Sequence, residues 1–142
     1  MGVRSARLLD VQAIEKAELN ESGLRGDHAR SGKRAVTLIQ AEHLPVIAAL
    51  SGRSRIAPEI LRRNIVIRGI NLTALRHNLL CIGGAMVAIS VPCAPCSRME
   101  KLLGTGGYNA MRGHGGWCAE VIKPGRVAVG DSVAPVYDNS VD

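Results

Sequence analysis

The sequence predicts a single, mainly β domain: a closed or nearly closed antiparallel barrel with a few short helices. Many short apolar runs recur at regular spacing between turn residues, which is typical of barrels. Few segments have helical spacing of apolar residues. The 142 residues suit one domain, 1–142, with one core. Because aromatic residues make up only 2% and Phe is absent, that core must consist of Ile, Leu, Val, Ala and Met.

The first part of the chain is predicted to contain two strands and a loop. Residues 3–9 are a candidate opening strand. Residues 18–33 are rich in Gly, Asn, Ser and charged residues, which predicts a loop because glycine accepts positive φ and short polar side chains bond the local backbone. The β-branched run at residues 35–39 predicts the next strand.

The longest helix is expected at residues 40–50. Apolar residues lie there near helical spacing, and the pair Ser51-Gly52 is a typical helix stop. Pro45 must then lie in the first turn, where its missing N–H costs nothing. A short helical turn at residues 59–63 leads into a strand at residues 64–67.

The second half is predicted to consist mostly of strands. The apolar runs at residues 79–82 and 85–91 are separated by Gly83-Gly84, which indicates a hairpin or a bulge. A cysteine-containing loop at residues 92–96 follows.

The chain is expected to close with two further strands. A short helix at residues 97–103 has Ser97 as its candidate cap. Residues 104–116 hold six glycines, which predicts a loop. Strands at residues 117–122 and 132–136 complete the predicted barrel.

The charge balance limits the partners. The formal net charge is +6 and cations gather in the first half, so we expect either an anionic partner, such as a phosphorylated or oxyanionic small molecule, or a solvated basic surface. Nucleic acid is disfavoured because few aromatic residues are present to stack bases. The sequence shows neither an apolar run long enough to span a membrane nor a signal core, so we expect a soluble, cytoplasmic protein. The first-half cations are Arg25, Arg30, Lys33, Arg34, Arg53, Arg55, Arg62, Arg63 and Arg68.

Cys96 is the candidate reactive thiol. It precedes the predicted helix at residues 97–103 and lies two residues from Arg98, and a helix N-terminus and a cation both favour the reactive thiolate. Pro92 and Pro95 would stiffen the loop that presents it. Cys93 is the second candidate. In the alternative interpretation, Cys93 and Cys96 only fill a small apolar corner.

The same region supports a second type of site. Four cysteines in a chain without a signal sequence indicate reduced thiols, metal ligation or catalysis. Cys93, Cys96, His114 and Cys118 have the spacing of a structural zinc site. A dithiol redox pair is the weaker alternative, because the sequence lacks a thioredoxin-like arrangement of strands and helix.

Further polar residues are candidates for anion binding. Arg112 and His114 lie in the glycine loop, whose backbone N–H groups suit an anion, although the glycines alone would also explain a flexible connection. Of the adjacent Arg62 and Arg63, one is expected to face solvent and the other to contact an oxyanion, with Asn64 orienting it.

Three histidines complete the candidates. Asp27 and His28 are either an acid–base pair or a backbone cap. His43 and His77 are expected to be structural.

Six motifs together resemble the MOSC domain, the module found at the C-terminus of eukaryotic molybdenum cofactor sulfurases. They occur in the family's order and spacing between about residues 20 and 136. The resemblance implies a barrel of the MOSC or pyruvate-kinase type. The motifs are Gly23-Leu-Arg-Gly-Asp-His28, Arg34-Ala-Val-Thr-Leu38, Leu61-Arg-Arg-Asn-Ile65, Pro95-Cys96, Arg112-Gly-His-Gly-Gly116 and Gly130-Asp-Ser-Val133.

The resemblance also implies a function. Cys96 would carry sulfur as a persulfide or ligate the molybdenum of a molybdopterin cofactor, and Cys93 would be an additional thiol, for resolution or sulfur relay. A sulfur transferase or a molybdenum-dependent oxidoreductase is expected, with a sulfur donor or redox protein in trans and no pyridoxal phosphate on this chain. The alternative is a non-catalytic carrier with zinc. The residues expected to line the pocket or its rim are Arg62, Arg63, Asn64, Arg112, His114, Gly26, Asp27 and His28.

Overall fold

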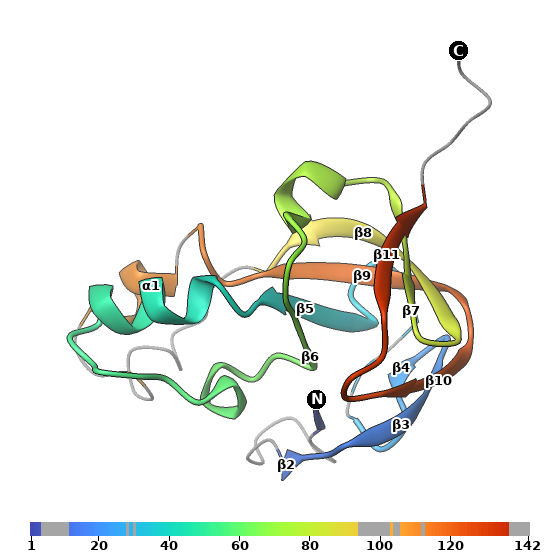
Figure 1. Cartoon of the computed structure of the whole chain (residues 1–142), viewed down its shortest axis with the longest axis horizontal. Helices are drawn as coiled ribbons and strands as arrows, with labels where there is room; N and C mark the ends of the chain where they lie inside the picture. Colours follow the sequence, from blue (N-terminus) through green and yellow to red (C-terminus); the bar gives the residue numbers. More distant parts are fainter. Residues whose placement is uncertain are drawn as a thin grey trace.

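A strongly curled sheet of six strands forms the centre of the molecule (Figure 1). The computed structural model describes residues 1–3, 12–27, 29, 31–93, 103, 106–111 and 113–136. Its strands are β1 (Gly2–Val3), β2 (Gln12–Ala13), β3 (Lys16–Asn20), β4 (Gly23–Leu24), β5 (Val36–Gln40), β6 (Ile65–Ile67), β7 (Leu79–Ile82), β8 (Ala85–Pro92), β9 (Trp117–Lys123), β10 (Gly125–Ala128) and β11 (Val133–Val136). Its helices are α1 (His43–Leu50) and α3 (Gly107–Met111), with 3-10 turns η1 (Pro58–Leu61) and η2 (Leu72–Leu75).

The central sheet has the order β11-β7-β8-β9-β5-β6. Every neighbouring pair is antiparallel except β5 and β6, which run parallel. Parallel neighbours need a crossover connection, and the segment with α1 and η1 provides it. In Figure 1 this segment, together with α3, extends to one side of the sheet. The helices therefore lie beside the barrel-like body at the end where β5 finishes.

A three-stranded sheet, β10-β3-β4, covers part of the central one. β10 follows β9 almost directly, so the chain passes from one sheet to the other around Pro124. Leu19, Leu24 and Val127 are buried from this smaller sheet into the main core. The two sheets together therefore enclose one aliphatic interior, as expected for a chain without Phe.

A second, smaller core lies under the helices. Ile47 and Ala48 of α1 meet Ala110 and Met111 of α3 there, and Ile39 links the cluster to the end of β5. Half of α1 has no such cover, since Val46 and Leu50 are exposed. The helical side is thus attached to the sheet by a modest apolar contact.

The mainly β fold predicted from the sequence is confirmed, and so is its hairpin. β7 and β8 pair from Leu79 opposite Ala88 to Ile82 opposite Ala85, around Gly83-Gly84. The helix expected at residues 40–50 is confirmed from His43 onward, while Gln40 belongs to β5. The turn expected at residues 59–63 occurs as η1, and the strands expected at 35–39, 64–67, 117–122 and 132–136 occur as β5, β6, β9 and β11.

Four expectations were wrong. Residues 18–33 are not only loop, because β3 and β4 form a hairpin there. Gly23 has φ +105°, and a Cβ on it would lie 2.2 Å from the Ala35 oxygen, so a glycine is needed where β4 approaches the backbone of Ala35. Residues 104–116 include the helix α3. β10 was not expected. The sheet is also not wholly antiparallel.

Two further predictions fall mostly outside the described residues. The opening strand at residues 3–9 is described only at Val3, in β1, and the helix at 97–103 only at Leu103. None of the helices in the described part of the chain is both long and apolar enough to span a membrane.

Candidate functional site

Two cysteine thiols meet where β8 ends beside β9. The Cys93 Sγ lies 3.4 Å from the Cys118 Sγ, and both side chains are buried. The Cys93 backbone N–H donates a 2.9 Å hydrogen bond to the Gly116 oxygen, which fixes the residue against β9. The register of β8 on β9 shifts between Ile89 and Pro92, just before this cysteine. The strand pairing thus brings together two thiols separated by 24 residues of sequence.

Arg63 lies next to this thiol pair and is held by backbone oxygens. Its Nε donates to the Gly115 oxygen at 2.5 Å, and its Nη1 donates to the Leu61 oxygen at 3.2 Å. Its Nη2 is buried and has no hydrogen-bond partner among the described residues. A buried donor of a charged group normally has a partner, so this nitrogen is suited to an anion.

The two thiols differ in acidity because one donates to the other. The hydrogen bond from the Cys93 thiol lowers the pKa of Cys118 to about 7, against the effect of burial and with help from the positive charges of Arg34 and Arg63. The same hydrogen bond and burial raise the pKa of Cys93. Cys118 is therefore the thiol of the pair that ionises near neutral pH, while Cys93 keeps its proton.

Two glycines make the close packing around the pair feasible. Gly116 has φ +93°, and a Cβ on it would lie 2.1 Å from the Leu38 oxygen of β5. A Cβ on Gly115 would lie 3.2 Å from the Arg63 Nη2. The end of the glycine loop is thus shaped by the approach of β9 to β5 and by the arginine.

A cavity of about 160 Å³ opens beside Cys93. Its walls come from the ends of β5, β8 and β9, from α1, from η2 and from the glycine loop. The residues that line it are Gln40, His43, Thr73, Pro92, Cys93, Gly113, Gly115, Gly116 and Trp117. Its contents must be small, because drug-sized ligands need pockets of roughly 300 Å³ or more.

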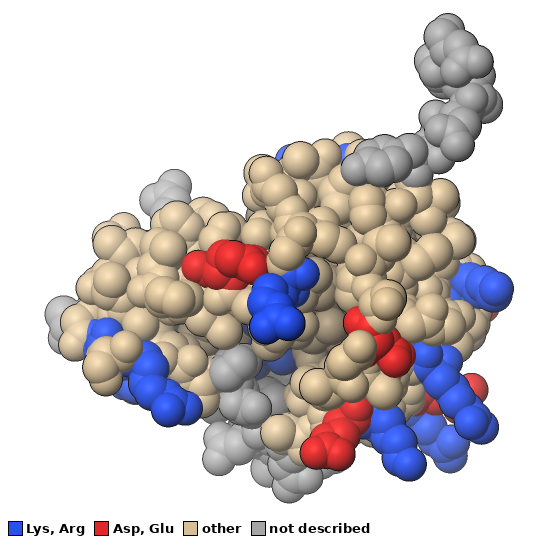
Figure 2. Space-filling model, in the orientation of Figure 1, with Lys and Arg blue, Asp and Glu red and all other residues tan. Residues whose placement is uncertain are grey.

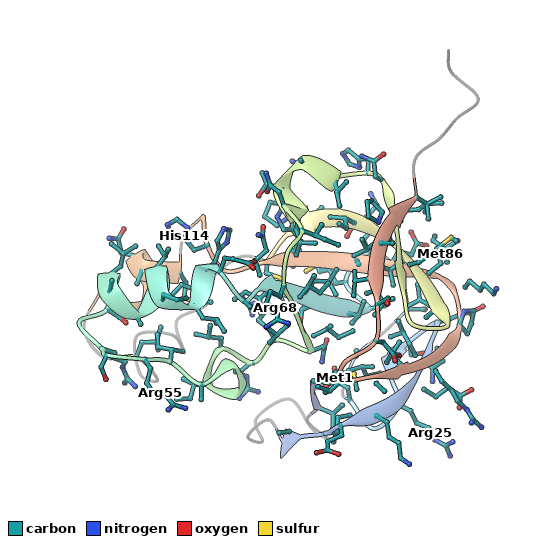
Figure 3. The ribbon with its side chains drawn as sticks, viewed as in Figure 1. Met1, Arg25, Arg55, Arg68, Met86 and His114 are labelled. Atoms are coloured by element: carbon teal, nitrogen blue, oxygen red, sulfur yellow. The ribbon has the colours of Figure 1, made fainter. Side chains whose placement is uncertain are left out.

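Two aromatic contacts define the walls of this cavity. The rings of His43 and His114 meet edge to face, with centroids 5.8 Å apart. Figure 3 shows His114 beside α1 and α3. The Arg76 guanidinium lies 5.6 Å from the centroid of the Trp117 ring, which is a cation–π arrangement. The cavity therefore has imidazole on one wall and indole on another.

The buried Asn64 connects three segments. Its Nδ2 donates to the Gly2 oxygen and to the Asp27 Oδ2, both at 3.0 Å, while its Oδ1 accepts from the Thr37 N–H at 2.9 Å. The Thr37 hydroxyl donates to the same Oδ1 and accepts from the Asn64 N–H. Asn64 thus ties the N-terminus and the turn after β4 to β5, with Asp27 accepting a hydrogen bond from it.

The structure places the predicted site residues in different surroundings. Cys93 lines the cavity, Arg63 is absent from the lining but donates to the oxygen of Gly115, which lines it, and His114 contacts His43. Arg62 has a positive φ of 60° and Gly26 lies in an exposed turn. Cys96, His28 and Arg112 lie outside the described residues.

Several cavity residues were not identified from the sequence. His43 was expected to be structural but lines the cavity, as do Gln40, Thr73 and Trp117. Cys118 was considered only as a zinc ligand. It lies next to the equally buried Ala119 in β9, and the local sequence gives no signal of its partner Cys93, because pairing across strands is set by register.

The predicted zinc site is only partly assembled by the described residues. Cys93 and Cys118 meet, yet within the described ranges no group of three or more His, Cys, Asp or Glu side chains is placed to hold a metal. The fourth expected ligand, Cys96, lies outside those ranges.

Charge is spread over the surface. Figure 2 shows Lys and Arg in separate groups at the lower left, in the middle and on the right of the viewed face, with Asp and Glu beside the central group and among those at the lower right. A hollow of about 490 Å³ lies between β3 and β10 and has charges of both signs, from Lys16, Glu18, Arg126 and Asp131. Because no cysteine or histidine lines it, the Cys93 cavity is the better candidate for chemistry.

Comparison with known proteins agrees with this architecture. The structure is similar to the YuaD protein from Bacillus subtilis, with a TM-score of 0.80, 20% identity, and coverage of 96% of this chain and 93% of that one. YiiM from Escherichia coli gives a TM-score of 0.73 at 23% identity over 96% and 68% of the two chains. YiiM from Geobacillus stearothermophilus gives 0.77 at 17% identity over 96% and 72%.

The family assignment comes from the sequence. No curated protein matches the chain by sequence. The family model of the MOSC domain matches residues 25–134, well over half of the chain, in agreement with the fold and with the six motifs. The chain therefore belongs to the MOSC domain family.

Proposed function

We propose that this MOSC protein accepts sulfur from a donor and passes it on, using the cysteines at positions 93 and 96. The observation that carries the proposal is the thiol pair Cys93–Cys118 beside a buried guanidinium nitrogen without a partner. A persulfide is anionic near neutral pH, so a cavity lined by a cysteine on which the charge of Arg63 acts suits it.

The transfer step is thiol–persulfide exchange. A cysteine thiolate attacks the terminal sulfur of a donor persulfide, a new S–S bond forms on the cysteine, and the donor leaves as a thiolate. No external oxidant or reductant is needed, since the sulfane sulfur only changes carrier. The resemblance makes Cys96 the first acceptor, and Cys93 is the thiol that lines the cavity.

A molybdenum cofactor is the second candidate ligand, and Arg63 is the observation that favours it. Thiolates are soft ligands that suit a transition metal, and the unpaired Arg63 Nη2 suits an anionic oxygen of such a group. Cys96 would hold the metal, with Arg63 and Arg112 at the anionic part. When bound, the cofactor supplies redox chemistry that side chains lack. The 160 Å³ cavity bounded by described residues would take only part of a pterin.

The donor or redox partner is expected to be another protein. The described residues offer one small cavity with a nucleophile, so sulfur must be brought to it by a carrier that presents its persulfide at the surface. We retain the expectation that pyridoxal phosphate acts on such a donor and not on this chain.

The test is sulfur uptake measured by intact mass. The protein is reduced, incubated anaerobically with glutathione persulfide and analysed together with Cys96→Ala, Cys93→Ala and the control Cys81→Ala, whose thiol lies on β7 away from the cavity lining. We expect the wild type and the control to take sulfur from the donor, counted as the glutathione set free, with that sulfur recovered either on the protein or as hydrosulfide. Cys96→Ala or Cys93→Ala is expected to lose this uptake. Equal uptake by all four proteins contradicts the proposal.

The cofactor alternative is tested by elemental analysis. The same variants are purified anaerobically from a host that makes molybdenum cofactor. Molybdenum that is present in the wild type and absent only from Cys96→Ala supports cofactor binding through that thiol. Zinc lost from both cysteine variants supports the non-catalytic carrier instead.

A further inference from the structure

Sulfur on a carrier cysteine has two fates that differ in their electron demand. Transfer to another thiol needs no electrons, whereas release as hydrosulfide needs two electrons for the sulfane sulfur. A second thiol within reach supplies them by closing a disulfide. The inference below rests on the proposed function and concerns Cys118, to which that function gives no chemical step.

The geometry of the pair suits disulfide closure. The two sulfurs are 3.4 Å apart, and a disulfide is about 2.05 Å long, so an approach of roughly 1.4 Å closes the bond. Cys93 follows the last residue of β8, whereas Cys118 lies within β9. Cys118 is also fixed through its oxygen, which accepts a 3.0 Å hydrogen bond from the Ser90 hydroxyl. The cysteine at the strand end therefore has to make most of the movement.

The two thiols are not equally accessible. Cys93 lines the cavity, while Cys118, which is also buried, is absent from its lining. Sulfur that enters the cavity therefore meets Cys93, and the Cys118 sulfur lies 3.4 Å from that of Cys93. This is the arrangement of an acceptor thiol with a resolving thiol.

We infer that Cys118 is a resolving cysteine that releases sulfur from Cys93 as hydrosulfide. The Cys118 thiolate attacks the Cys93 Sγ of the protonated Cys93 persulfide, the S–S bond of the persulfide breaks as a Cys93–Cys118 disulfide forms, and the terminal sulfur leaves as hydrosulfide with its proton and the bonding electron pair. The sulfane sulfur is reduced and the two cysteine sulfurs are oxidised. A cellular dithiol or glutathione then reduces the disulfide and restores the pair.

Arg63 favours this step electrostatically. Its buried Nη2 has no partner among the described residues, and its charge acts on both sulfurs. The positive charge of this guanidinium favours the Cys118 thiolate that begins the reaction.

The experiment follows sulfur and disulfide together. Reduced wild type, Cys118→Ser and the control Cys81→Ser receive limiting glutathione persulfide without further thiol. Hydrosulfide is quantified, and trapped peptides are mapped for persulfide and disulfide. We expect the wild type and Cys81→Ser to release hydrosulfide and gain a Cys93–Cys118 disulfide in equal amounts. Cys118→Ser is expected to keep the persulfide on Cys93, with at least a tenfold loss of release.

Three results would overturn the inference. Hydrosulfide release from Cys118→Ser at the wild-type rate removes the role of Cys118. Sulfur retained only on Cys96, with Cys93 and Cys118 still thiols, leaves the proposed carrier function intact but excludes resolution. If no protein takes up sulfur, the carrier function itself is wrong. Equilibration of the wild type in a glutathione redox buffer then tests whether Cys93 and Cys118 form a disulfide. If both cysteines stay reduced under oxidising conditions, the assignment of Cys118 as a resolving thiol fails as well.

Discussion

Replacement of Gly116 by alanine tests whether the site depends on the close approach of β9 to β5. A Cβ at this position would lie 2.1 Å from the Leu38 oxygen and 3.0 Å from the Leu38 carbonyl carbon. Carbon–oxygen contacts normally begin near about 3.3 Å, so the two backbones must separate by about 1 Å. The residue also has φ +93°, where an L side chain is strained.

The expected cost follows from these two terms. The left-handed backbone contributes about 1–2 kcal/mol and the overpacking a further 1–3 kcal/mol or so, giving a loss of about 2–5 kcal/mol in the free energy of unfolding. At a urea slope of roughly 2 kcal/mol/M, a loss of about 3 kcal/mol lowers the unfolding midpoint by about 1.5 M.

Gly130→Ala is the matched control. Gly130 has nearly the same φ, +96°, but a Cβ there would meet no described atom within 4 Å. It should lose only the conformational cost of about 1–2 kcal/mol. If the two variants unfold within about 0.5 kcal/mol of each other, the close contact with Leu38 does not limit this position and the reasoning is refuted.

Three further predictions concern the polar groups of the site. Arg63→Met should lose about 2 kcal/mol in the free energy of unfolding, because the Gly115 and Leu61 oxygens lose a charged donor. It should also slow the alkylation of the thiol pair near neutral pH, whereas Arg63→Lys should retain more of the rate. Equal alkylation rates for the wild type and both variants would contradict the electrostatic role of Arg63. The free energy of unfolding should rise between about pH 7, the lowered pKa of Cys118, and pH 9.0, its ordinary value, because in this range the unfolded chain still holds the Cys118 proton. It should fall above pH 9.0, because Cys93 then keeps its proton in the folded state only. A flat pH profile in urea titrations would exclude this difference in pKa between the two thiols. Asn64→Asp should destabilise the protein by about 3 kcal/mol in thermal unfolding, because a carboxylate replaces the amide that donates to Asp27. Lowering the pH should recover part of this loss. If Asn64→Asp is as stable as the wild type, the donor role of Asn64 is excluded.

The fold was predictable where the chain repeats simple patterns. The hairpin of β7 and β8 follows from two apolar runs around Gly83-Gly84. The six motifs identified the family, and with it the barrel. The hairpin of β3 and β4 was missed because it is short and mostly polar, and its pairing with β10 and the core contacts of Leu19 and Leu24 are not visible in the local sequence.

The site was only partly predictable for a different reason. Chemistry marked Cys93 and Arg63 as candidates, since a loop thiol and adjacent arginines are informative by type. Cys118 became relevant through strand register, and His43 through the crossover that brings the start of α1 to the cavity. Neither feature is encoded in the residues next to them, so local reasoning could not join Cys118 to Cys93.

The position of Trp117 gives the protein a built-in optical probe. It is the only tryptophan in the chain, it forms part of the cavity wall, and a cationic side chain lies over its ring. Indole emission depends on neighbouring charge and solvent, and no second indole adds a background signal. Entry of an anion or a persulfide into the cavity should therefore change the intrinsic fluorescence, so that occupancy can be followed in real time on the unlabelled protein.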